Sequence, residues 1–428
     1  MTTPFRLGIA GLGTVGTGVL AIAQTQAAEL EAKLGRPLIV TAVSARDRGR
    51  DRGVDLSGLA WVENAVDLVH RADVDCVVEV IGGADGIAKD LVEAAIAAGK
   101  HVVTANKALI AHHGHGLALA AEAAGVVLRG EAGVAGGIPV LRGLSEGLAA
   151  NRVTRVFGVL NGTCNYILTE MEATGRAYVD VLAEAQAKGY AEADPSFDVG
   201  GIDAAHKLAI LASQAFGTRI DFDGVVCEGI DQVSPADIET ARDMGFAIKL
   251  IAHAQRHGDG LEQRVRPCMV DRRTAIGGLP GVTNAVVVDA DPVGQIALIG
   301  PGAGRGATAS AVMSDVLDAA RGHLVPLFGQ PAAGLTAAPR LAHGQEATPY
   351  YLRFTLADRP GALAEIATAL GAAGLSIHRM RQYGQGDPVP VVIVTHPVAR
   401  QRIDAALAEI AGLGVSRSAP VAIQIEET

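Results

Sequence analysis

The chain has 428 residues, which is too long for one ordinary hydrophobic core and predicts about two or three domains. Hydrophobic residues make up 49% of it and charged residues 19%, so the composition excludes a disordered chain. A net charge of −10 and only 4% aromatic residues argue against nucleic-acid partners, which need a basic face or stacking rings. No apolar run is long enough to span a bilayer, no signal sequence precedes Phe5, and the four cysteines are isolated, so we expect a cytoplasmic protein without a membrane partner.

The first part of the chain alternates strands and helices. Short apolar runs predict buried strands at 5–10, 38–43, 76–80 and 101–104. Helical patterns from 14 to about 34 and from about 87 to 98 lie between them, and each ends at a glycine. A further short strand is expected at 126–128. This order predicts an α/β fold with a Rossmann-type doubly wound parallel sheet.

The pattern changes after residue 130. A glycine-rich segment at 131–139 is followed by further helices and strands, and a second glycine cluster at 300–306 precedes a helix from about 307 to 321. Residues 322–349 are rich in Pro, Ala and Gly, as is typical of a linker. From 350 to 428 the order βαββαβ predicts a compact ferredoxin-like unit.

A glycine loop joins the first strand to the first helix. Gly11 permits the tight turn, Gly13 lets the backbone approach a pyrophosphate, and Gly16 lets the helix pack closely on the strand. The helix then begins at Thr14 and Val15, where unpaired N–H groups favour phosphate charge. The loop therefore predicts a bound dinucleotide.

The end of the second strand indicates which dinucleotide is bound. Ser44 and Arg46 offer a hydroxyl and a guanidinium, which suit the 2′-phosphate of NADP. Asp47 leaves NAD open as the alternative, because in a shifted register its carboxylate would accept the hydrogen bond from the ribose 2′-hydroxyl of NAD. Arg46 is otherwise an ordinary solvated loop charge. We expect NADP, with NAD as the alternative.

Two lysines and an aspartate are candidates for the chemistry. Lys107 follows the strand at 101–104, and open α/β sheets bind their ligands at the carboxyl ends of strands. Asp203 and Lys207 lie one turn apart on a helix expected from about 202 to 216, which follows the acidic segment 192–198. Groups converging there would suit a substrate with an amine or a hydroxyl. The alternatives are that Lys107 only adds solubility and that Asp203 and Lys207 form an ordinary ion pair on the surface.

Two further groups contain residue types that bind metal ions. Glu131 and the turn after it, through Pro139, could form a cation site from one carboxylate and backbone carbonyls. His112, His113 and His115 have no carboxylate at a useful spacing, so we interpret them as helix-surface residues rather than metal ligands.

Seven segments, in order, closely resemble homoserine dehydrogenases of the long type, which carry a C-terminal ACT regulatory domain. They are GLGTVG at 11–16, VVEVIGG at 77–83, VVTANKALIA at 102–111, EAGVAGGIPV at 131–140, GVLNGTCNYIL at 158–168, EADPSFDVGGIDAAHKLAIL at 192–211 and GPGAGRGATASAVMSD at 300–315. The LADRPGAL segment at 356–363 is similar to the beginning of an ACT domain. One departure is Cys164, where we expect threonine.

The resemblance implies an NAD(P)-dependent interconversion of L-homoserine and L-aspartate 4-semialdehyde, on the route to threonine, isoleucine and methionine. It implies that Lys107 and Asp203 are the catalytic pair. The substrate-binding groups that it implies are Asn161, Thr163, Glu192, Asp198 and Lys207. The cofactor site would extend from the glycine loop, Ser44 and Arg46 to Gly82, Thr104, Lys107 and Gly302. A monovalent cation, usually sodium, would be held by Glu131 and the carbonyls of Val134, Gly136 and Ile138.

The resemblance also implies a domain plan. Residues 1–130, with about 300–321, would bind the dinucleotide, and residues 131–299 would form an α+β catalytic and dimerisation domain. After the linker at 322–349, residues 350–428 would form the ACT domain. ACT domains bind amino acids where subunits pair, so we expect feedback inhibition by threonine and a homodimer or homotetramer.

Two other functions remain as alternatives. A phosphorylating semialdehyde dehydrogenase would need a cysteine nucleophile with a histidine base; Cys164 lies in a plausible loop, but His206 is expected on the other side of its helix from Lys207. A non-catalytic amino-acid sensor would use the ACT unit as its ligand-binding module and would carry a degenerate Rossmann domain. Its catalytic positions should then be damaged, whereas Lys107 and Asp203 are both present.

Overall fold

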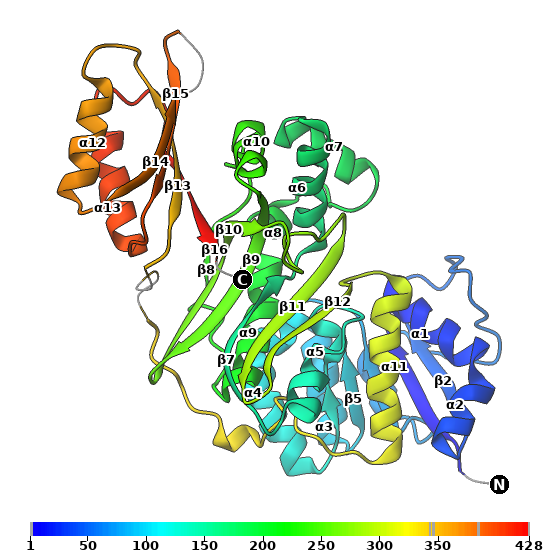
Figure 1. Cartoon of the computed structure of the whole chain (residues 1–428). Coiled ribbons are helices and arrows are strands. Elements are labelled where there is room, and N and C mark those ends of the chain that lie inside the picture. The colour runs from blue at the N-terminus through cyan, green and yellow to red at the C-terminus, as the bar shows by residue number, and fades with distance from the viewer. Residues whose placement is uncertain (1–2, 342–343, 345–346, 383–385, 427–428) are drawn as a thin grey trace.

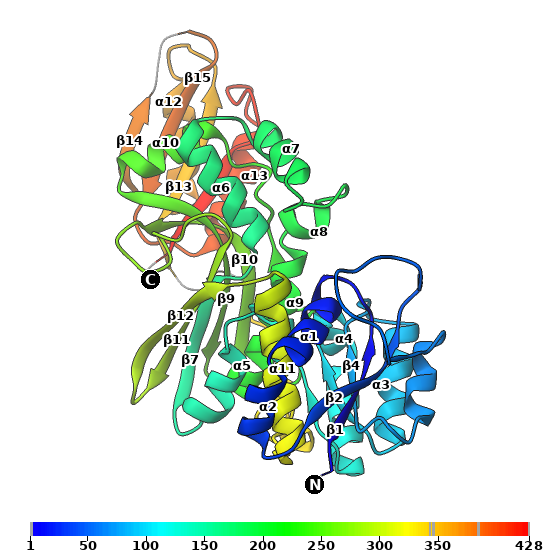
Figure 2. The ribbon, with the colours of Figure 1, turned by 90° about the vertical axis from the view of Figure 1, so that its right-hand side faces the viewer.

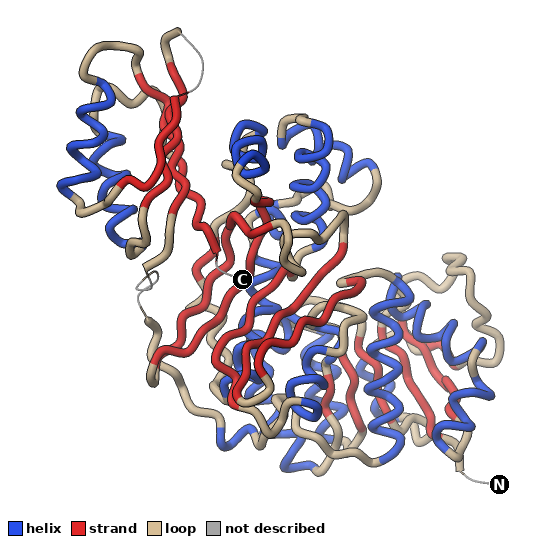
Figure 3. The backbone as a smooth tube through the Cα atoms, in the orientation of Figure 1, coloured by secondary structure: helices blue, strands red, loops and turns tan. Residues whose placement is uncertain are grey.

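The computed structural model describes residues 3–341, 344, 347–382 and 386–426. Figure 1 shows a helix-flanked sheet near the N-terminus, a central sheet with its own helices, and a smaller C-terminal unit. Figure 3 shows the strands of the last two parts running alongside one another, and together they form one sheet. Among these residues, no helix is long and apolar enough to cross a membrane.

The N-terminal sheet is parallel, with the order β3-β2-β1-β4-β5-β6 among the described residues. Its strands are β1 (Phe5–Ala10), β2 (Leu38–Ser44), β3 (Ala60–Trp61), β4 (Cys76–Glu79), β5 (His101–Thr104) and β6 (Leu128–Arg129). The helices around it are α1 (Thr14–Thr25), α2 (Ala27–Leu34), α3 (Ile87–Ala97), α4 (Lys107–Ala124) and the 3₁₀ turn η1 (Ala65–His70). The predicted doubly wound sheet is confirmed. Its strand order reverses between β1 and β4, and such sheets bind their ligands there, at the carboxyl ends of the strands.

Two details of this part differ from the prediction. The single helix expected from 14 to about 34 is broken at Gln26, whose φ of −114° and ψ of 22° end α1 before α2 begins. Neither glycine nor proline lies at the break, so the sequence gives no local signal for it. The strand expected at 126–128 is instead Leu128–Arg129.

A later helix returns to this sheet. α11 (Arg305–Arg321) lies beside α1 in both Figure 1 and Figure 2. Gly18 allows the approach, because a Cβ there would lie 2.7 Å from the Arg305 carbonyl oxygen and 2.8 Å from the Cβ of Ala309. Up to α11 the chain therefore crosses between the two sheets twice, once through 130–150 and once directly before α11; it crosses again after α11, through 322–341.

The central part carries the second sheet. Its strands are β7 (Arg152–Val159), β9 (Phe246–His257), β10 (Gly260–Asp271), β11 (Thr283–Asp291), β12 (Gly294–Pro301) and the short β8 (Val226–Cys227), which pairs with β10. Its helices are α6 (Gly162–Thr174), α7 (Tyr178–Ala187), α8 (Ser196–Val199), α9 (Ile202–Phe216) and α10 (Pro235–Asp243). The crossing segment holds η2 (Glu131–Gly133), α5 (Val140–Arg142) and η3 (Gly143–Gly147), a single π-helical turn.

The C-terminal unit has the predicted βαββαβ order. It consists of β13 (Tyr350–Leu356), α12 (Ala362–Ala372), β14 (Ile377–Gln382), β15 (Val389–Thr395), α13 (Arg400–Ala411) and β16 (Val421–Glu426). The strands lie in the order β16-β13-β15-β14, as in ferredoxin-like folds. Before it, residues 322–349 include η4 (Ala332–Gly334) and pair with the central part through the Thr218–Thr336 and Leu261–Arg340 bridges.

β16 also belongs to the central sheet. It pairs in parallel with β10, with Cys268 opposite Gln424 and Val270 opposite Glu426. Glu426 is buried there, 2.8 Å from the Nδ1 of His253 and 2.8 Å from the guanidinium of Arg264. The sequence predicted a compact appended unit, but the structure shows one sheet running from β12 to β14 through this junction.

Candidate active site

The glycine loop has the geometry that dinucleotide binding needs. Gly11 has a φ of +101°, and a Cβ there would lie 2.5 Å from the Val80 carbonyl oxygen. A Cβ at Gly16 would overlap the Gly11 carbonyl oxygen, so only glycine lets α1 lie so close to the loop. Gly13 has no neighbouring atom within 4 Å of its Cβ position, which leaves that side open. The first turn of α1 has no acidic residue and no side-chain cap, so its N–H groups can receive a phosphate at Thr14 and Val15.

The residues expected at the 2′-position lie beside this loop. Ser44 is buried, and its carbonyl oxygen accepts a hydrogen bond from the Gly11 N–H at 2.9 Å. Arg46 is exposed just beyond β2. Asp47 accepts a hydrogen bond from the Gly49 N–H at 2.9 Å, so one of its oxygens already serves its own turn. The Arg46 guanidinium is therefore more available for a 2′-phosphate than the Asp47 carboxylate is for a ribose hydroxyl.

A buried glutamate organises the ends of β4 and β5. Glu79 accepts hydrogen bonds from the N–H groups of Ile81 and Gly82, at 2.8 and 3.1 Å, and from the hydroxyl of Thr104 at 2.5 Å. Asn106 donates to the Gly83 carbonyl at 2.7 Å and caps α4 through the Leu109 N–H. Thr104 therefore fixes the loops around the cofactor site through Glu79, and α4 begins with Lys107 at this edge.

Three charged side chains meet where the N-terminal sheet with its helices adjoins the central part: Lys107, Asp203 and Lys207. The Nζ of Lys107 lies 3.2 Å from one oxygen of Asp203, and the Nζ of Lys207 lies 2.7 Å from the other. Lys207 also donates to the Leu160 carbonyl at 2.7 Å. Asp203 is buried, and burial alone would raise its pKa; the two lysines outweigh burial and lower the pKa to about 2. Asp203 is thus a permanent carboxylate between two cations.

Asn161 connects this cluster to the acidic loop. Its Nδ2 donates to Asp203 at 2.9 Å and to Asp198 at 2.8 Å, while its Oδ1 accepts the Cys164 N–H that begins α6. Burial raises the pKa of Asp198, the Asn161 hydrogen bond lowers it, and the Asp203 charge raises it again. The structure therefore brings together Lys107, Asp203, Lys207, Asn161 and Asp198 of the predicted site.

Two predicted substrate residues lie at the margin. The Thr163 hydroxyl donates to the Tyr190 carbonyl at 2.8 Å. Glu192 is exposed, and its backbone carbonyl accepts from Gln186 at 3.0 Å. Both belong to the loop that borders the cluster, but neither is among the side chains that contact Asp203.

An aromatic wall that the sequence did not reveal stands beside Lys107. The Phe197 ring centroid lies 6.0 Å from the Nζ of Lys107, and Phe197 stacks on His206 at 5.5 Å. His206 in turn stacks on Phe222 at 4.2 Å and contacts the ring of His112. These rings come from separate helices and a loop, so no periodic pattern in the sequence signals the stack. His113 also differs from the prediction, because its Nε2 lies 2.8 Å from the exposed carboxylate of Asp85.

The structure disfavours a cysteine-based mechanism. Cys164 is fully buried with its Sγ 3.3 Å from the Asp198 carbonyl, and burial raises the pKa of its thiol well above the usual value. A thiolate nucleophile needs the opposite shift. His206 is packed between rings, where burial lowers its pKa to about 4.

The proposed cation turn lies where the chain first crosses between the sheets. Ala135 and Gly136 both have positive φ, 55° and 56°, so the backbone is left-handed at two successive residues. Among the backbone hydrogen bonds of the described turn, Glu131 accepts from Val134, and Ile138 accepts from Val140. The carbonyl oxygens of Val134 and Gly136 accept neither of these hydrogen bonds. The Glu131 carboxylate accepts the N–H groups of Leu141 and Arg142, at 2.9 and 2.8 Å, so it is already engaged by the turn.

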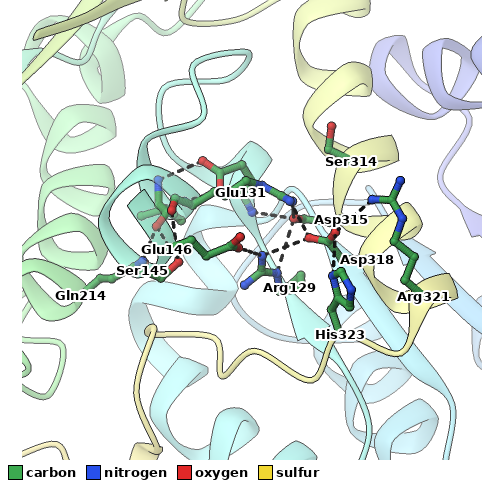
Figure 4. A network of polar contacts seen from close by, with 12 residues as sticks. Arg129, Glu131, Ser145, Glu146, Gln214, Ser314, Asp315, Asp318, Arg321 and His323 are labelled. Atoms are coloured by element: carbon green, nitrogen blue, oxygen red, sulfur yellow. Dashed lines mark hydrogen bonds and ion pairs between the residues drawn. The ribbon is translucent and has the colours of Figure 1, made fainter. Parts of the chain in front are cut away.

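A polar network joins this turn to α11 (Figure 4). The Glu131 N–H donates to the buried Asp315 at 2.9 Å, and Arg129 lies between Asp315 and Asp318. Arg142 reaches the same two aspartates at 3.2 and 2.6 Å. The network thus connects the first two crossings of the chain. Burial, and then the Asp315 charge, raise the pKa of Glu131 to about 7.

We expect the raised pKa of Glu131 to make the protein less stable as pH rises. Between its ordinary pKa of 4.5 and about 7, the folded chain keeps a proton that the unfolded chain loses. The free energy of unfolding should therefore fall across that window, by up to about 3 kcal/mol from this group. Glu131→Gln should flatten the fall, as measured by urea unfolding at about pH 5 and about pH 8. The exposed Glu29→Gln is the control, and equal pH dependence in both variants would contradict the assignment.

The two halves of the site define a class of protein: an oxidoreductase that acts on a CH–OH group with a nicotinamide dinucleotide. Residues 11–131 match the family model "Homoserine dehydrogenase, NAD binding domain", residues 139–317 match "Homoserine dehydrogenase", and residues 350–415 match the ACT domain. The homoserine dehydrogenase of Neisseria gonorrhoeae is 42% identical over 418 residues, covering 96% of each chain. The chain therefore belongs to the homoserine dehydrogenase family.

Solved structures agree with this membership. A crystal structure of a homoserine dehydrogenase from Thiobacillus denitrificans matches with a TM-score of 0.93 and 41% identity, covering 99% of both chains. A hyperthermophilic archaeal homoserine dehydrogenase in complex with NADPH matches with a TM-score of 0.63 and 26% identity, covering 74% of this chain and 98% of that one.

Proposed function

We propose that this dehydrogenase interconverts L-homoserine and L-aspartate 4-semialdehyde through Lys107 and Asp203, on the route to threonine, methionine and isoleucine. The observation that carries the proposal is the Asp203 carboxylate held between two lysines at the edge where the glycine loop lies. The nicotinamide supplies the hydride acceptor and donor. Lys107 holds the proton at the substrate's hydroxyl oxygen, and Asp203 keeps the Lys107 ammonium in place.

The remaining polar groups suit an amino-acid substrate. Asp198 and Glu192 lie on the acidic loop and would bind its ammonium group, with Thr163 at the border. Lys207, tied to Asp203 and to the Leu160 carbonyl, would orient the substrate together with Asn161. The aromatic wall of Phe197, His206 and Phe222 covers one side of Lys107, which limits the access of water to the proton transfer.

We further propose that NADP is preferred. Arg46 supports this, as does the NADPH bound by the archaeal relative. The cofactor would rest on Gly11, Gly13, Gly16 and Gly82, near Gly302. The turn with Val134 and Gly136 would hold a monovalent cation, sodium in our proposal, with the Ile138 carbonyl and Glu131 beside it. The four free cysteines support a cytoplasmic location.

Regulation would come through the C-terminal unit. An ACT domain suggests an amino-acid effector, and threonine, as the end product, is our proposed inhibitor of a homodimer or homotetramer. Asp237 connects this domain to α10, since its buried carboxylate accepts from Tyr351 at 2.8 Å and from Arg353 at 2.7 Å. α10 packs against α6, whose cap is Asn161. The proposed effector would act along this contact.

Initial rates with L-homoserine test these proposals. NADP should give a kcat/KM at least about tenfold above NAD, and Arg46→Ala should remove about tenfold from the NADP value alone, because a charge-assisted contact to the phosphate is lost. Arg50→Ala, on the same exposed loop, is the control. Threonine should lower the rate, and Arg353→Leu should weaken that effect. An Arg46→Ala enzyme with unchanged preference would refute the NADP assignment.

A further inference from the structure

A side-chain amide without a hydrogen-bond partner lies buried near the place where the central part meets the N-terminal sheet and its helices. Asn284, on β11, is 1% exposed, and neither its Oδ1 nor its Nδ2 has a hydrogen-bond partner within the described chain. Most buried donors and acceptors are paired, because an unpaired one loses its water and gains nothing. Asn165, equally buried, shows the usual case: its Nδ2 donates to the Gly281 carbonyl at 2.7 Å and its Oδ1 accepts from Lys249 at 2.8 Å.

The surroundings of Asn284 place it between the substrate and cofactor parts of the site. A Cβ at Gly302 would overlap the Asn284 amide, and a Cβ at Gly162 would lie 3.5 Å from its Oδ1. Gly162 directly follows Asn161, which contacts Asp203. Gly302 precedes α11, and at the beginning of α11 Arg305 donates to the Thr17 carbonyl of α1 at 3.3 Å. The amide is therefore close to both the substrate cluster and the glycine-loop helix.

The backbone of Gly302 lies against the amide, since a Cβ there would overlap it. Residues 302–304 of this segment carry one methyl group between them. Gly304 has a φ of +113°, a conformation that only glycine adopts readily. A ligand that displaced this backbone would meet no large side chain of that segment.

We propose that Asn284 binds the carboxamide of the nicotinamide ring. A primary amide offers one acceptor and one donor group, and the matching ligand is another primary amide. The nicotinamide carries such a group beside the ring carbon that exchanges hydride with the substrate. This group must therefore lie on the substrate side of the cofactor, where Asn161 and Gly162 mark the edge of the substrate cluster. The inference rests on the nicotinamide cofactor of the proposed function.

Cofactor analogues test this contact directly. Calorimetric titration would compare NADP with its 3-acetylpyridine analogue, in which a methyl group replaces the amide NH₂, and with 2′-phospho-ADP-ribose, which lacks the ring. The wild type should bind NADP about tenfold more tightly than the acetylpyridine analogue, the equivalent of one hydrogen bond. In Asn284→Ala and Asn284→Leu this ratio should fall to about one, while the affinity for 2′-phospho-ADP-ribose stays unchanged.

The outcomes separate the inference from its premise. If the wild type binds no member of this series or of the matching NAD series, the cofactor assignment fails. If the wild type binds them and the variants keep its ratio, Asn284 does not contact the carboxamide. Since two variants of different size are used, a packing defect in one does not decide the result.

Thermal unfolding of the cofactor-free enzyme distinguishes a ligand-binding amide from a structural one. An amide that is unpaired without cofactor contributes nothing to stability, so Asn284→Leu should leave the Tm unchanged or raise it. Asn165→Leu is the matched control and should lower the Tm, because it removes a partner from the buried Lys249. A comparable fall in Asn284→Leu would show that the amide holds a buried water as part of the fold, and would overturn the inference.

Discussion

Replacing Lys107 by methionine should lower kcat by about 10²- to 10⁴-fold, the usual contribution of a positioned proton-transfer group. Methionine keeps an unbranched side chain, one atom shorter, but has no group that can transfer a proton. The KM for L-homoserine should change far less, because Asp198, Lys207 and Asn161 remain. The fold should tolerate the change, since about a third of the Lys107 side chain is exposed. Initial rates with saturating cofactor measure the effect.

Lys89→Met is the control for this prediction, because Lys89 pairs with Glu93 on the surface of α3, at 3.0 Å. The pH profile adds a second check. With a pKa of about 2, Asp203 is ionised throughout the working range, so the acid limb of kcat/KM should not report its titration. Should Lys107→Met keep more than a tenth of the wild-type turnover, the proton would have to be carried by another group.

Glu426→Gln should lower the free energy of unfolding by about 3 kcal/mol, the scale seen when one partner of a buried ion pair is removed. Glu426 is buried between Arg264 and His253 at the β10–β16 junction. Burial raises the pKa of Glu426, but Arg264 and His253 outweigh it and hold the pKa well below its ordinary range. The stabilisation is therefore present at neutral pH and is lost as the pH falls below the ordinary carboxyl range.

Urea unfolding at neutral pH and at about pH 4 measures this effect, and the difference between the wild type and the variant should be smaller at the lower pH. Glu409→Gln, on the exposed face of α13, is the control and should change the free energy of unfolding by less than about 0.5 kcal/mol. A variant as stable as the wild type at neutral pH would show that desolvation of the junction cancels its ion pairs.

The sequence predicted the parts of the site that depend on local spacing. Gly11, Gly13 and Gly16 lie between a strand and a helix, and the chain has few ways to arrange them. Lys107 follows a strand at the carboxyl edge, so the α/β order alone places it near the ligand. The i,i+4 spacing of Asp203 and Lys207 on one helix made their contact predictable, as the 2.7 Å distance shows.

What could not be predicted depends on contacts between distant segments. The Phe197–His206–Phe222 stack needs separate helices and a loop to meet, and the surroundings of the buried Asn284 amide include Gly162, which lies far earlier in the chain. The pairing of β16 with β10 could not be predicted for the same reason. A strand's hydrophobic pattern shows which of its faces is buried but does not identify the strand that pairs with it. The sequence therefore predicts a separate ACT unit and not a sheet shared with the central part.

The shared sheet has a consequence for how the chain folds as it is made. Arg264 and Glu426, partners across the junction, are 162 residues apart. During synthesis, residues 268–270 of β10 therefore lack their neighbour until the ACT domain has left the ribosome. An unpaired strand edge is a site of wrong pairing between chains, and contacts of such long sequence separation form slowly. Once it has paired, the ACT domain thus also protects this edge of the catalytic sheet, and slowed synthesis between 271 and 421 should increase aggregation.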